Sequence, residues 1–318
     1  MLREDDIQAL LPMTEALRLV EDALRLQGEG EAENRPRTRI PYPGGLFHYM
    51  AGAVPAQHAV GLKASASSSS GAHLVVLLFD TDSNVLLSVL EADWLGRIRT
   101  GAASGVATKA LAAHGASVGG VIGAGGQAET QIEAVTAAVP LKTVKVFSRT
   151  PERREALVKR LQPRVPADLV PVASAEEAVR DSDVVTTVTT AAEPVFNGDW
   201  LKPGAHVNAA GGNRSNRREL DNATVFRADF VAVDSLEQAK LECGDLIIPA
   251  REHPGIWSRV VELGSMLAGK NRGRTSPTEI SLFESQGIAI EDVAVARYVY
   301  DRARQRGMGQ SVEFGGTD

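Results

Sequence analysis

Residues 118–131 read "VGGVIGAGGQAETQ", and this stretch decides the fold of the chain. An apolar run leads into glycines spaced G-x-G-x-x-A, and "QAETQIEAVTAAV" then has the character of a helix. Gly123 permits a tight turn, Gly125 lets a backbone approach a pyrophosphate, and Ala128 keeps the helix close to the sheet. The N–H groups at the helix start favour phosphate, so we predict a dinucleotide-binding turn, with an ordinary glycine-rich loop as the alternative. Its predicted cofactor-binding residues are Gly123, Gly125, Gly126, Gln127 and Ala128.

The end of the next strand reads "SRTPERR", residues 148–154. Proteins specific for NAD usually place a carboxylate there, which accepts hydrogen bonds from the ribose 2′-hydroxyl. This chain has hydroxyl and guanidinium groups, which bind a 2′-phosphate through charge-assisted hydrogen bonds. We therefore predict a preference for NADP(H) over NAD(H), with contacts from Ser148, Arg149, Thr150 and Arg153. Arg154 is expected to be a solvated helix residue, and the alternative is that Arg153 is solvated as well.

Strands and helices alternate from Val118 onward, which indicates βαβ units and a parallel sheet. Before this region, residues 37–89 form short apolar or alternating runs separated by turn sequences, which is typical of antiparallel hairpins. Two helices separated at Pro12 precede the hairpins, and an Ala-rich helix over residues 99–115 follows them. The segment 277–307 is expected to open with a loop and to end in a long helix.

The predicted fold class is α/β, with a Rossmann-type parallel sheet domain and a second, α+β domain whose sheet is mostly antiparallel. The second domain is predicted to cover residues 1–112, with the C-terminal segment 298–318 packing on it. The NADP(H)-binding Rossmann domain is predicted to cover residues 113–297. The tail from residue 308 is expected to be loose.

Composition excludes several classes of function. The chain has 318 residues, 43% hydrophobic and 23% charged, with a net charge of −6, so we expect a globular protein without a nucleic-acid surface. We find neither a membrane span nor a signal peptide, and we predict a cytoplasmic location. Cys243 is the single cysteine, and a small buried residue is the better interpretation because no Cys–His pattern surrounds it. No metal site is predicted.

Cations in the first part of the chain are candidates for substrate binding. Lys63 stands among small and apolar residues in "AVGLKASAS", and Arg99 opens the Ala-rich helix. Arg37 and Arg39 share one face of an expected strand, because side chains alternate along it. Arginine clamps a carboxylate through two hydrogen bonds, and lysine donates a proton when burial and nearby cations lower its pKa. The pattern predicts a pocket for a small carboxylate, and the alternative is that each cation is solvated.

Several stretches along almost the whole chain occur in the order found in one known family. They are "PRT" (36–38), "GLK" (61–63), "RTGAAS" (99–104), "GAGGQA" (123–128), "HVNAAGGNRSNRREL" (206–220), "VDSLEQAKLECGDL" (233–246) and "GRTSPTEISLFESQGIAIEDVAVA" (273–296). Together they resemble the ornithine cyclodeaminase/mu-crystallin family. The resemblance implies a Rossmann domain plus a substrate-binding domain whose sheet mediates dimerisation, so a homodimer is expected.

The resemblance also assigns roles to residues. It implies that Arg37, Lys63 and Arg99 hold a substrate carboxylate, with Lys63 next to the reacting carbon. The residues that it brings to the cofactor are Thr100, Val188, Thr189, Thr190 and Ala210. Arg39 has no family counterpart and is left out of the site. "SQG" (285–287) is placed near the nicotinamide, and the alternative is that it and "ECGDL" cap helices.

Asn213 departs from the family's cyclodeaminases, which carry Asp at this position for the second amine and for ring closure. Asparagine can orient a group, but it neither takes a proton nor carries a negative charge. We keep Asn213 as a candidate catalytic residue beside Lys63 and Arg99, and the alternative is a turn residue. Asp234 and Asp292 are expected to be structural.

The sequence therefore predicts an NADP(H)-dependent oxidoreductase that acts on the C–N bond of a small 2-amino or 2-imino acid. This corresponds to the amino-acid dehydrogenase or ketimine/imine reductase branch of the family rather than to true ornithine cyclodeaminases. One alternative is a cyclodeaminase-type lyase that recycles its NAD(P) internally. Another is a non-catalytic, NADPH-dependent ligand-binding protein of the mu-crystallin type. Alanine-like, cyclic and N-alkylated substrates all remain open.

Overall fold

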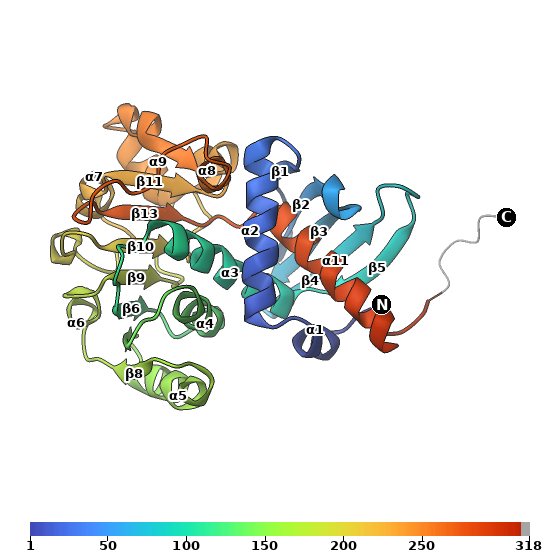
Figure 1. Ribbon diagram of the computed structural model, residues 1–318, viewed down its shortest axis with the longest axis horizontal. Coiled ribbons are helices and arrows are strands. Elements are labelled where there is room, and N and C mark those ends of the chain that lie inside the picture. Colours follow the sequence, from blue (N-terminus) through green and yellow to red (C-terminus); the bar gives the residue numbers. More distant parts are fainter. Residues whose placement is uncertain (313–318) are drawn as a thin grey trace. The chain divides into compact units, whose positions relative to one another are not determined.

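The computed structural model describes residues 1–312, and the chain divides into two compact units. The terminal unit contains Met1–Arg99 and the segment from Ile288 onward, and the central unit contains Thr100–Gly287. Figure 1 colours the terminal unit blue to cyan and red, and the central unit green to orange. Residues 313–318 of the tail that was predicted to be loose lie outside the described residues.

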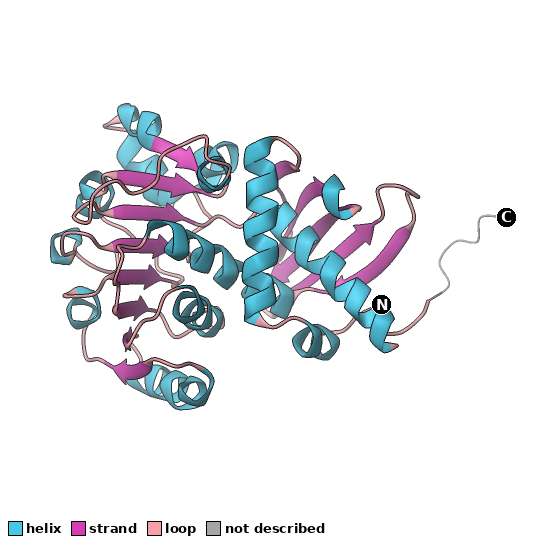
Figure 2. Ribbon diagram, viewed as in Figure 1, coloured by secondary structure: helices cyan, strands magenta, loops and turns pink. Residues whose placement is uncertain are grey.

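The terminal unit is built from a meander of antiparallel strands and from helices near both chain ends. Its strands are β1 (Glu33–Tyr42), β2 (Gly45–Val54), β3 (Ala59–Ser68), β4 (Gly71–Phe79) and β5 (Leu86–Glu91). Its helices are α1 (Glu4–Leu10), α2 (Met13–Glu29), the 3-10 turn η1 (Pro55–Gln57) and α11 (Ala289–Arg306). The strands pair in the order β1-β2-β3-β4-β5, which confirms the predicted hairpins. Figure 2 draws the strands in magenta and the helices in cyan. Pro12 separates α1 from α2, as predicted.

Helix α11 lies across one face of this sheet (Figure 1). Met50, Val76 and Leu90 occupy paired positions on β2, β4 and β5, and all three are fully buried. Lys63 of β3 completes this row between Met50 and Val76. A Cβ added at Gly52, two residues from Met50, would lie 2.9 Å from a side-chain atom of α11, so this is the face that α11 covers. A lysine therefore stands in an otherwise apolar buried row.

Helix α3 (Asp93–Leu111) begins earlier than the sequence predicted. The Glu4 carboxylate accepts hydrogen bonds from the backbone N–H groups of Asp93 and Trp94, at 2.7 and 2.8 Å. These donors have no partner inside the helix, and a carboxylate at a helix start also suits the helix dipole. The predicted start at Arg99 is wrong, because the capping group comes from a distant part of the chain.

The chain passes between the two units inside α3, because Arg99 belongs to the terminal unit and Thr100 to the central unit. The predicted domain boundary, between residues 112 and 113, lies instead just after the end of this helix at Leu111. The segment that returns to the terminal unit starts at Ile288, whereas residues up to 297 had been assigned to the Rossmann domain. A continuous helix shows no change of composition where the units divide, so the sequence held no signal for this position.

The central unit contains one parallel sheet among the described residues, in the order β12-β11-β13-β10-β9-β6-β7-β8. The strands are β6 (Val118–Ile122), β7 (Thr143–Phe147), β8 (Asp168–Pro171), β9 (Val184–Thr187), β10 (His206–Ala209), β11 (Phe230–Val233), β12 (Val260–Glu262) and β13 (Ser281–Glu284). The helices are α4 (Ala128–Ala138), α5 (Pro151–Leu161), α6 (Ala175–Val179), α7 (Asn222–Arg227), α8 (Leu236–Glu242), α9 (Gly244–Ala250) and α10 (Leu263–Leu267), with 3-10 turns η2 (Gln162–Arg164), η3 (Gly198–Trp200) and η4 (Pro254–Arg259).

The strand order reverses between β6 and β9. From β6 the chain builds outward through β7 and β8, and it then returns to add β9 and β10 on the other side. In open α/β sheets, ligands bind beyond the carboxyl ends of the strands at such a reversal. The parallel sheet confirms the predicted Rossmann-type fold class.

Strand β13 corrects the predicted loop at the start of the segment 277–307. It pairs with β10 on one side and β11 on the other, so it is a central strand of the sheet. Four residues are too few to show a strand period, and the preceding "GRTSPTE" is rich in loop-forming residues. Only the pairing with two distant strands makes this segment extended.

Candidate functional site

A cavity of about 690 Å³ opens beyond the carboxyl ends of β6, β7 and β9. It lies at the reversal of strand order, where the fold places a dinucleotide. The predicted cofactor-binding residues that line it are Gly123, Gly125, Ser148, Arg149, Thr150, Arg153, Val188, Thr189 and Thr190. The structure therefore brings the glycine turn, the end of β7 and the loop after β9 together around one cavity.

The glycine turn has a conformation that only glycine fits well. Gly123 has φ of +128°, and a Cβ there would lie 2.4 Å from the carbonyl oxygen of Val188. Gly125 is exposed, and a Cβ there would meet no protein atom within 4 Å. Packing within the protein therefore does not require glycine at position 125. A pyrophosphate that lies close against the backbone of the turn would require it. The cavity fits the pyrophosphate of a dinucleotide.

The end of β7 presents hydroxyl and guanidinium groups to the cavity. Ser148, Arg149, Thr150 and Arg153 line it, and the carboxylate among its lining residues is Glu193, on the loop after β9. The Ser148 hydroxyl donates to the Thr150 carbonyl at 3.0 Å, which shapes the turn into α5.

Arg154 does not line this cavity within the described residues. It is half-buried, its guanidinium lies 5.8 Å from the centre of the Phe147 ring, and it donates to the Ser148 carbonyl at 2.9 Å. It supports the end of the strand, so the expectation of a solvated side chain is wrong.

Five predicted cofactor residues lie outside the set that lines the cavity, namely Thr100, Gly126, Gln127, Ala128 and Ala210. Thr100 is buried, and its carbonyl accepts a hydrogen bond from Gln131 Nε2 at 3.3 Å. Ala128 is buried in the core under α4, as its expected packing role requires. Their contacts with a cofactor stay a prediction.

Glu219 is a residue of this site that the sequence analysis missed. Its buried carboxylate accepts hydrogen bonds from the Thr189 N–H at 2.6 Å, the Gly211 N–H at 2.9 Å and the Thr187 hydroxyl at 3.0 Å. Burial raises the pKa of Glu219, and these donors act against that effect. Glu219 thus ties the cavity-lining loop after β9 to the loop after β10. The carboxylate in "RREL" was visible in the sequence, but its partners were not.

A second carboxylate supports the first. Asp245 accepts hydrogen bonds from the backbone N–H groups of Glu219 and Leu220 at 2.8 and 2.6 Å, and burial raises its pKa to about 7.

Asp234 accepts hydrogen bonds from the N–H groups of Gln286 and Gly287 at 2.7 and 2.6 Å, so it fixes the "SQG" segment. This geometry agrees with the structural role expected for Asp234, while contact of "SQG" with nicotinamide remains untested.

The terminal unit carries the other predicted site, a buried cluster around Lys63. The Lys63 ammonium and the Arg99 guanidinium are both 6% exposed. Lys63 Nζ and Arg99 Nε each donate to Oδ1 of Asp292 at 2.9 Å, and Arg99 Nη1 donates to Glu291 Oε2 at 2.9 Å. The two predicted cations are therefore brought together by adjacent carboxylates at the start of α11.

The electrostatics of this cluster favour a proton donor. The pKa of Lys63 is lowered from 10.5 to about 8, first by burial and then by the charge of Arg99, while Asp292 raises it. Burial would raise the pKa of Asp292, but the charges of Arg99 and Lys63 outweigh it and hold that pKa below its usual value. Lys63 is thus charged at neutral pH, close to the pH at which it would release a proton.

Arg37 belongs to the same electrostatic environment, because its charge also lowers the pKa of Lys63. It occupies an irregularity in β1 between Arg35 and Thr38, opposite Met50, the neighbour of Lys63 on β2. Arg39 pairs in register with His48 beyond this bulge.

Asn213 lies in the central unit, exposed, on the loop that follows β10. It is not among the residues that line the cavity described above, and its catalytic role stays a prediction.

Asp292 and Glu291 are the other residues that sequence reasoning missed, and Asp292 had been assigned a structural role. Asp292 lies 229 positions from Lys63, and neither pattern nor spacing connects residues so far apart. One signal was present: two consecutive acids at the start of a long, otherwise apolar helix segment must be exposed or paired with cations.

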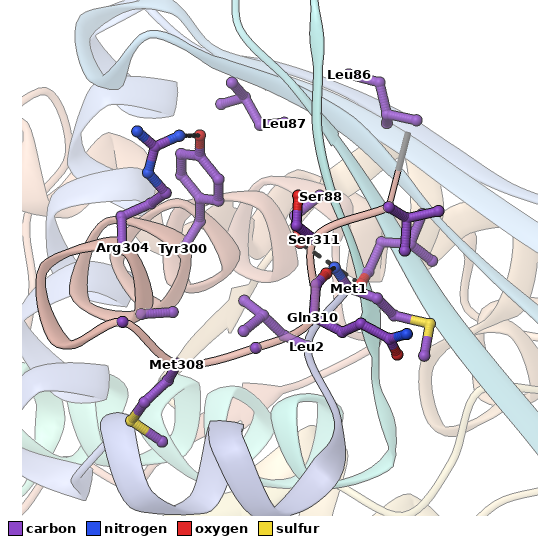
Figure 3. A pocket seen from close by; sticks show the side chains of 15 residues that line it. Met1, Leu2, Leu86, Leu87, Ser88, Tyr300, Arg304, Met308, Gln310 and Ser311 are labelled. Atoms are coloured by element: carbon purple, nitrogen blue, oxygen red, sulfur yellow. Dashed lines mark hydrogen bonds between the residues drawn. The ribbon is translucent and has the colours of Figure 1, made fainter. Parts of the chain in front are cut away.

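Another cavity, of about 660 Å³, lies in the terminal unit near the end of α11 and β5 (Figure 3). The Met1 amine donates to the Gln310 carbonyl at 2.6 Å, and Arg304 donates to the Tyr300 hydroxyl at 3.3 Å. Among the described residues, none of those predicted for the site lines this cavity. It is therefore separate from the cofactor cavity and from the cluster around Lys63.

Across residues 1–312, no group of three or more His, Cys, Asp or Glu side chains is arranged to hold a metal ion. None of the helices in that range has the length and apolar character needed to cross a membrane. Cys243 is buried, as expected, and its thiol donates to Glu284 Oε2 at 3.4 Å. Burial raises the pKa of this thiol, which makes it a poor nucleophile.

The parallel sheet, its glycine turn and the cavity beside them define a dinucleotide-binding protein of the Rossmann class. More specifically, the chain belongs to the ornithine cyclodeaminase/mu-crystallin family, whose model matches residues 1–307. This confirms the resemblance drawn from the sequence.

Relatives with curated names and solved structures extend this result. The Delta(1)-pyrroline-2-carboxylate reductase of Bacillus cereus (strain ZK / E33L) is 40% identical over 241 residues, which cover 76% of this chain and 74% of the relative. The structure of Thermococcus litoralis Delta(1)-pyrroline-2-carboxylate reductase in complex with NADH and L-proline has a TM-score of 0.92 and 34% identity, covering 98% of this chain and 99% of that one. An archaeal alanine dehydrogenase dimer with bound NAD has a TM-score of 0.92 and 31% identity, covering 99% and 98%.

Proposed function

We propose that this protein reduces a small 2-imino acid to the corresponding amino acid and that it prefers NADPH to NADH. Its class is that of its relatives: it is a nicotinamide-dependent oxidoreductase acting on CH–NH2 or CH–NH/C=N groups. The observation that carries the proposal is the buried cluster of Lys63, Arg99 and Asp292. A cyclic imine, such as the pyrroline-2-carboxylate named for two relatives, is the first substrate to test.

The charge of the cluster suits a carboxylate. Formally, Lys63, Arg99 and Arg37 supply three positive charges, and Asp292 and Glu291 supply two negative ones. These five side chains sum to a formal charge of +1, and Lys63 and Arg99 among them are largely shielded from water. A substrate with one carboxylate would bring it to neutrality, and arginine would fix the orientation of that carboxylate.

Lys63 is proposed to donate the proton that the substrate nitrogen needs. A proton donor works best when its pKa lies near the working pH, and the pKa of Lys63 is lowered to about 8. The chemistry that a bound nicotinamide supplies is the transfer of hydride to or from carbon. The residues of the terminal unit then hold the carboxylate, orient the imine and exclude water from it.

The preference for NADPH is proposed from the end of β7. Arg149 and Arg153 supply positive charge, and Ser148 and Thr150 supply hydroxyl groups, around the part of the cavity where a ribose 2′-phosphate would bind. Two of the solved relatives are described with NADH or NAD, so a preference for NADPH would distinguish the present chain from them.

A homodimer is proposed on separate grounds. The sheet face away from α11 carries Tyr49 and Val75, 37% and 36% exposed, on positions that flank the paired Ala64. Ile40 is 50% exposed on β1. An exposed apolar sheet face is a common mark of an interface. Light scattering coupled to size-exclusion chromatography would give the mass of the particle in solution and so test the dimer.

A cytoplasmic location stays a prediction.

One experiment tests the proposed reaction. Absorbance at 340 nm should fall when NADPH is mixed with the protein and a panel of cyclic imino acids, or with 2-keto acids plus ammonia or methylamine. Reduction should consume one NADPH for each substrate molecule, and NADPH should give the higher kcat/KM by at least tenfold. Release of ammonia from ornithine with no net change in NADPH would instead identify a cyclodeaminase, and tight binding without turnover would identify a ligand-binding protein.

A further inference from the structure

Asp292 makes contacts that a merely neutralising carboxylate would not need. Its Oδ1 accepts from both Lys63 Nζ and Arg99 Nε at 2.9 Å, and the residue is completely buried. Its other oxygen, Oδ2, is buried with no hydrogen-bond partner among the described residues. A buried carboxylate oxygen without a donor is costly, so its presence beside Lys63 calls for an explanation.

The two neighbouring acids share Arg99 as a partner, and Asp292 also pairs with Lys63. Glu291 Oε2 contacts Arg99 Nη1 at 2.9 Å, so Arg99 already has a carboxylate partner without Asp292. Asp292 is the carboxylate whose ion pair with the Lys63 ammonium the structure records. Both acids stand in the first turn of α11, so the rigid helix fixes their positions relative to the sheet beneath it.

We propose that Asp292 is the positioning residue of the active site, which fixes the Lys63 ammonium in one place and keeps it charged until its proton passes to the substrate nitrogen. This inference rests on the proposed function, in which Lys63 is the proton donor. Asp292 acts through Lys63 and need not touch the substrate itself.

The proton passes from Lys63 to the imine nitrogen. An N–H bond of Lys63 breaks, its electron pair stays on Nζ, and the proton forms an N–H bond with the lone pair of the imine nitrogen. The electrons for the imine carbon come with the hydride. Neutral Lys63 then regains a proton from water, and the Asp292 carboxylate favours this step because it stabilises the ammonium form.

Several charged or titratable groups surround Lys63. The groups that act on its pKa are Asp292 from α11, Arg99 from α3 and Arg37 from β1. Glu291 pairs with Arg99, and His48 lies on the same face of β2 as the partner of Lys63. Arg99 and Arg37 lower the pKa of Lys63, and Asp292 raises it. Removing the carboxylate of Asp292 should therefore lower the pKa of Lys63 further, and the lysine should lose its proton at a lower pH.

The test is the pH dependence of kcat/KM for the Asp292→Asn variant, measured by NADPH oxidation over a range of cyclic imine concentrations, because kcat/KM reports the ionisation of groups before the imine binds. In the wild type, kcat/KM should fall on the alkaline limb of the pH profile near the pKa of Lys63, about 8. In Asp292→Asn this alkaline limb should move down by about one pH unit or more, which costs about tenfold in kcat/KM above neutral pH and little in acid. A uniform loss at every pH would show a structural role only and would overturn the inference.

Asp301→Asn is the matched control. Asp301 stands on the same helix, its side chain is 45% exposed, and it pairs with Arg297. The alkaline limb should stay at its wild-type position in this variant. A limb that moved equally in both variants would also contradict the inference, because it would reflect α11 as a whole.

Two further variants separate the possible failures. If Lys63→Ala keeps wild-type turnover, the proposed role of Lys63 is wrong. If Lys63→Ala is inactive but Asp292→Asn leaves the limb unmoved, only the inference about Asp292 fails. Should Asp292→Asn not fold, Asp292→Glu keeps the charge while displacing it by one methylene. Its kcat/KM should fall while the alkaline limb keeps its wild-type position, and an alkaline limb shifted to lower pH would contradict the inference.

Discussion

Replacing Lys63 by Met should remove most of the turnover and yet make the protein more stable at neutral pH. The side chain is 5% exposed and stands in a row with Met50, Val76 and Leu90, so a methionine of similar length fits the apolar surroundings. Turnover should fall by about 10²- to 10⁴-fold, the usual contribution of a positioned proton donor. Stability should change in the opposite direction because a buried charge is removed.

The structure sets the size of the stability change. The pKa of Lys63 is lowered from 10.5 to about 8, mainly by burial, and each unit corresponds to about 1.36 kcal/mol. Keeping Lys63 charged in the folded state therefore costs about 3 kcal/mol at most. Loss of the charged hydrogen bond to Asp292, which keeps Arg99 as a partner, offsets about 1.5–3 kcal/mol, so a net gain of up to about 2 kcal/mol is expected.

The stability advantage of Lys63→Met depends on pH, because Lys63 has a lower pKa in the folded protein than in the unfolded chain. Between about pH 8 and 10.5 the unfolded chain binds the Lys63 proton more tightly than the folded one, so the contribution of Lys63 to the free energy of unfolding rises with pH. Below pH 8 the full cost of the buried charge is present, and above 10.5 it is gone. The advantage of Lys63→Met should thus shrink as the pH rises through this window.

Urea unfolding followed by near-UV circular dichroism, at neutral pH and again near pH 10, measures both effects. Lys159→Met is the control, since Lys159 is exposed on α5, and it should leave the free energy of unfolding nearly unchanged. A Lys63→Met variant less stable than the wild type at neutral pH would refute the reasoning. So would an advantage that does not diminish with pH.

Two further predictions concern the cofactor cavity. Ser148→Asp should lower the preference for NADPH over NADH by at least tenfold in kcat/KM, because a carboxylate repels a 2′-phosphate and accepts from a 2′-hydroxyl. An unchanged ratio would mean that the end of β7 does not meet the ribose. Glu219→Gln should weaken NADPH binding by about tenfold in a fluorescence titration, with the KM for the imine unchanged, because its amide hydrogens face backbone N–H donors. Equal losses in both would indicate general unfolding instead.

Local sequence patterns predicted part of the lining of the cofactor cavity. The turn at Gly123 and the hydroxyl and guanidinium groups after β7 are separated by few residues, and a strand–turn–helix unit fixes where they lie. The loop of residues 188–190 was assigned to the cofactor by the family resemblance and not by spacing, and residues 126–128 lie outside the set that lines the cavity.

The substrate side could be predicted only in part, because its partners are distant in sequence. Alternation along β3 shows which face Lys63 occupies, but it does not show that α11 covers that face with Asp292. The same limit hid the capping of α3 by Glu4 and the strand pairing of β13. In each case one side chain or backbone group finds its partner only after the chain has folded.

The construction of the terminal unit from both ends of the chain has a consequence for its synthesis. The strands β1 to β5 leave the ribosome before the central unit, but α11, which covers their apolar face, is made after it. The central unit is continuous in sequence and can fold while the sheet of the terminal unit waits uncovered. During this interval the row containing Met50 and Val76 is open to chaperones and to aggregation, so slower translation of the last segment should reduce the yield of native protein.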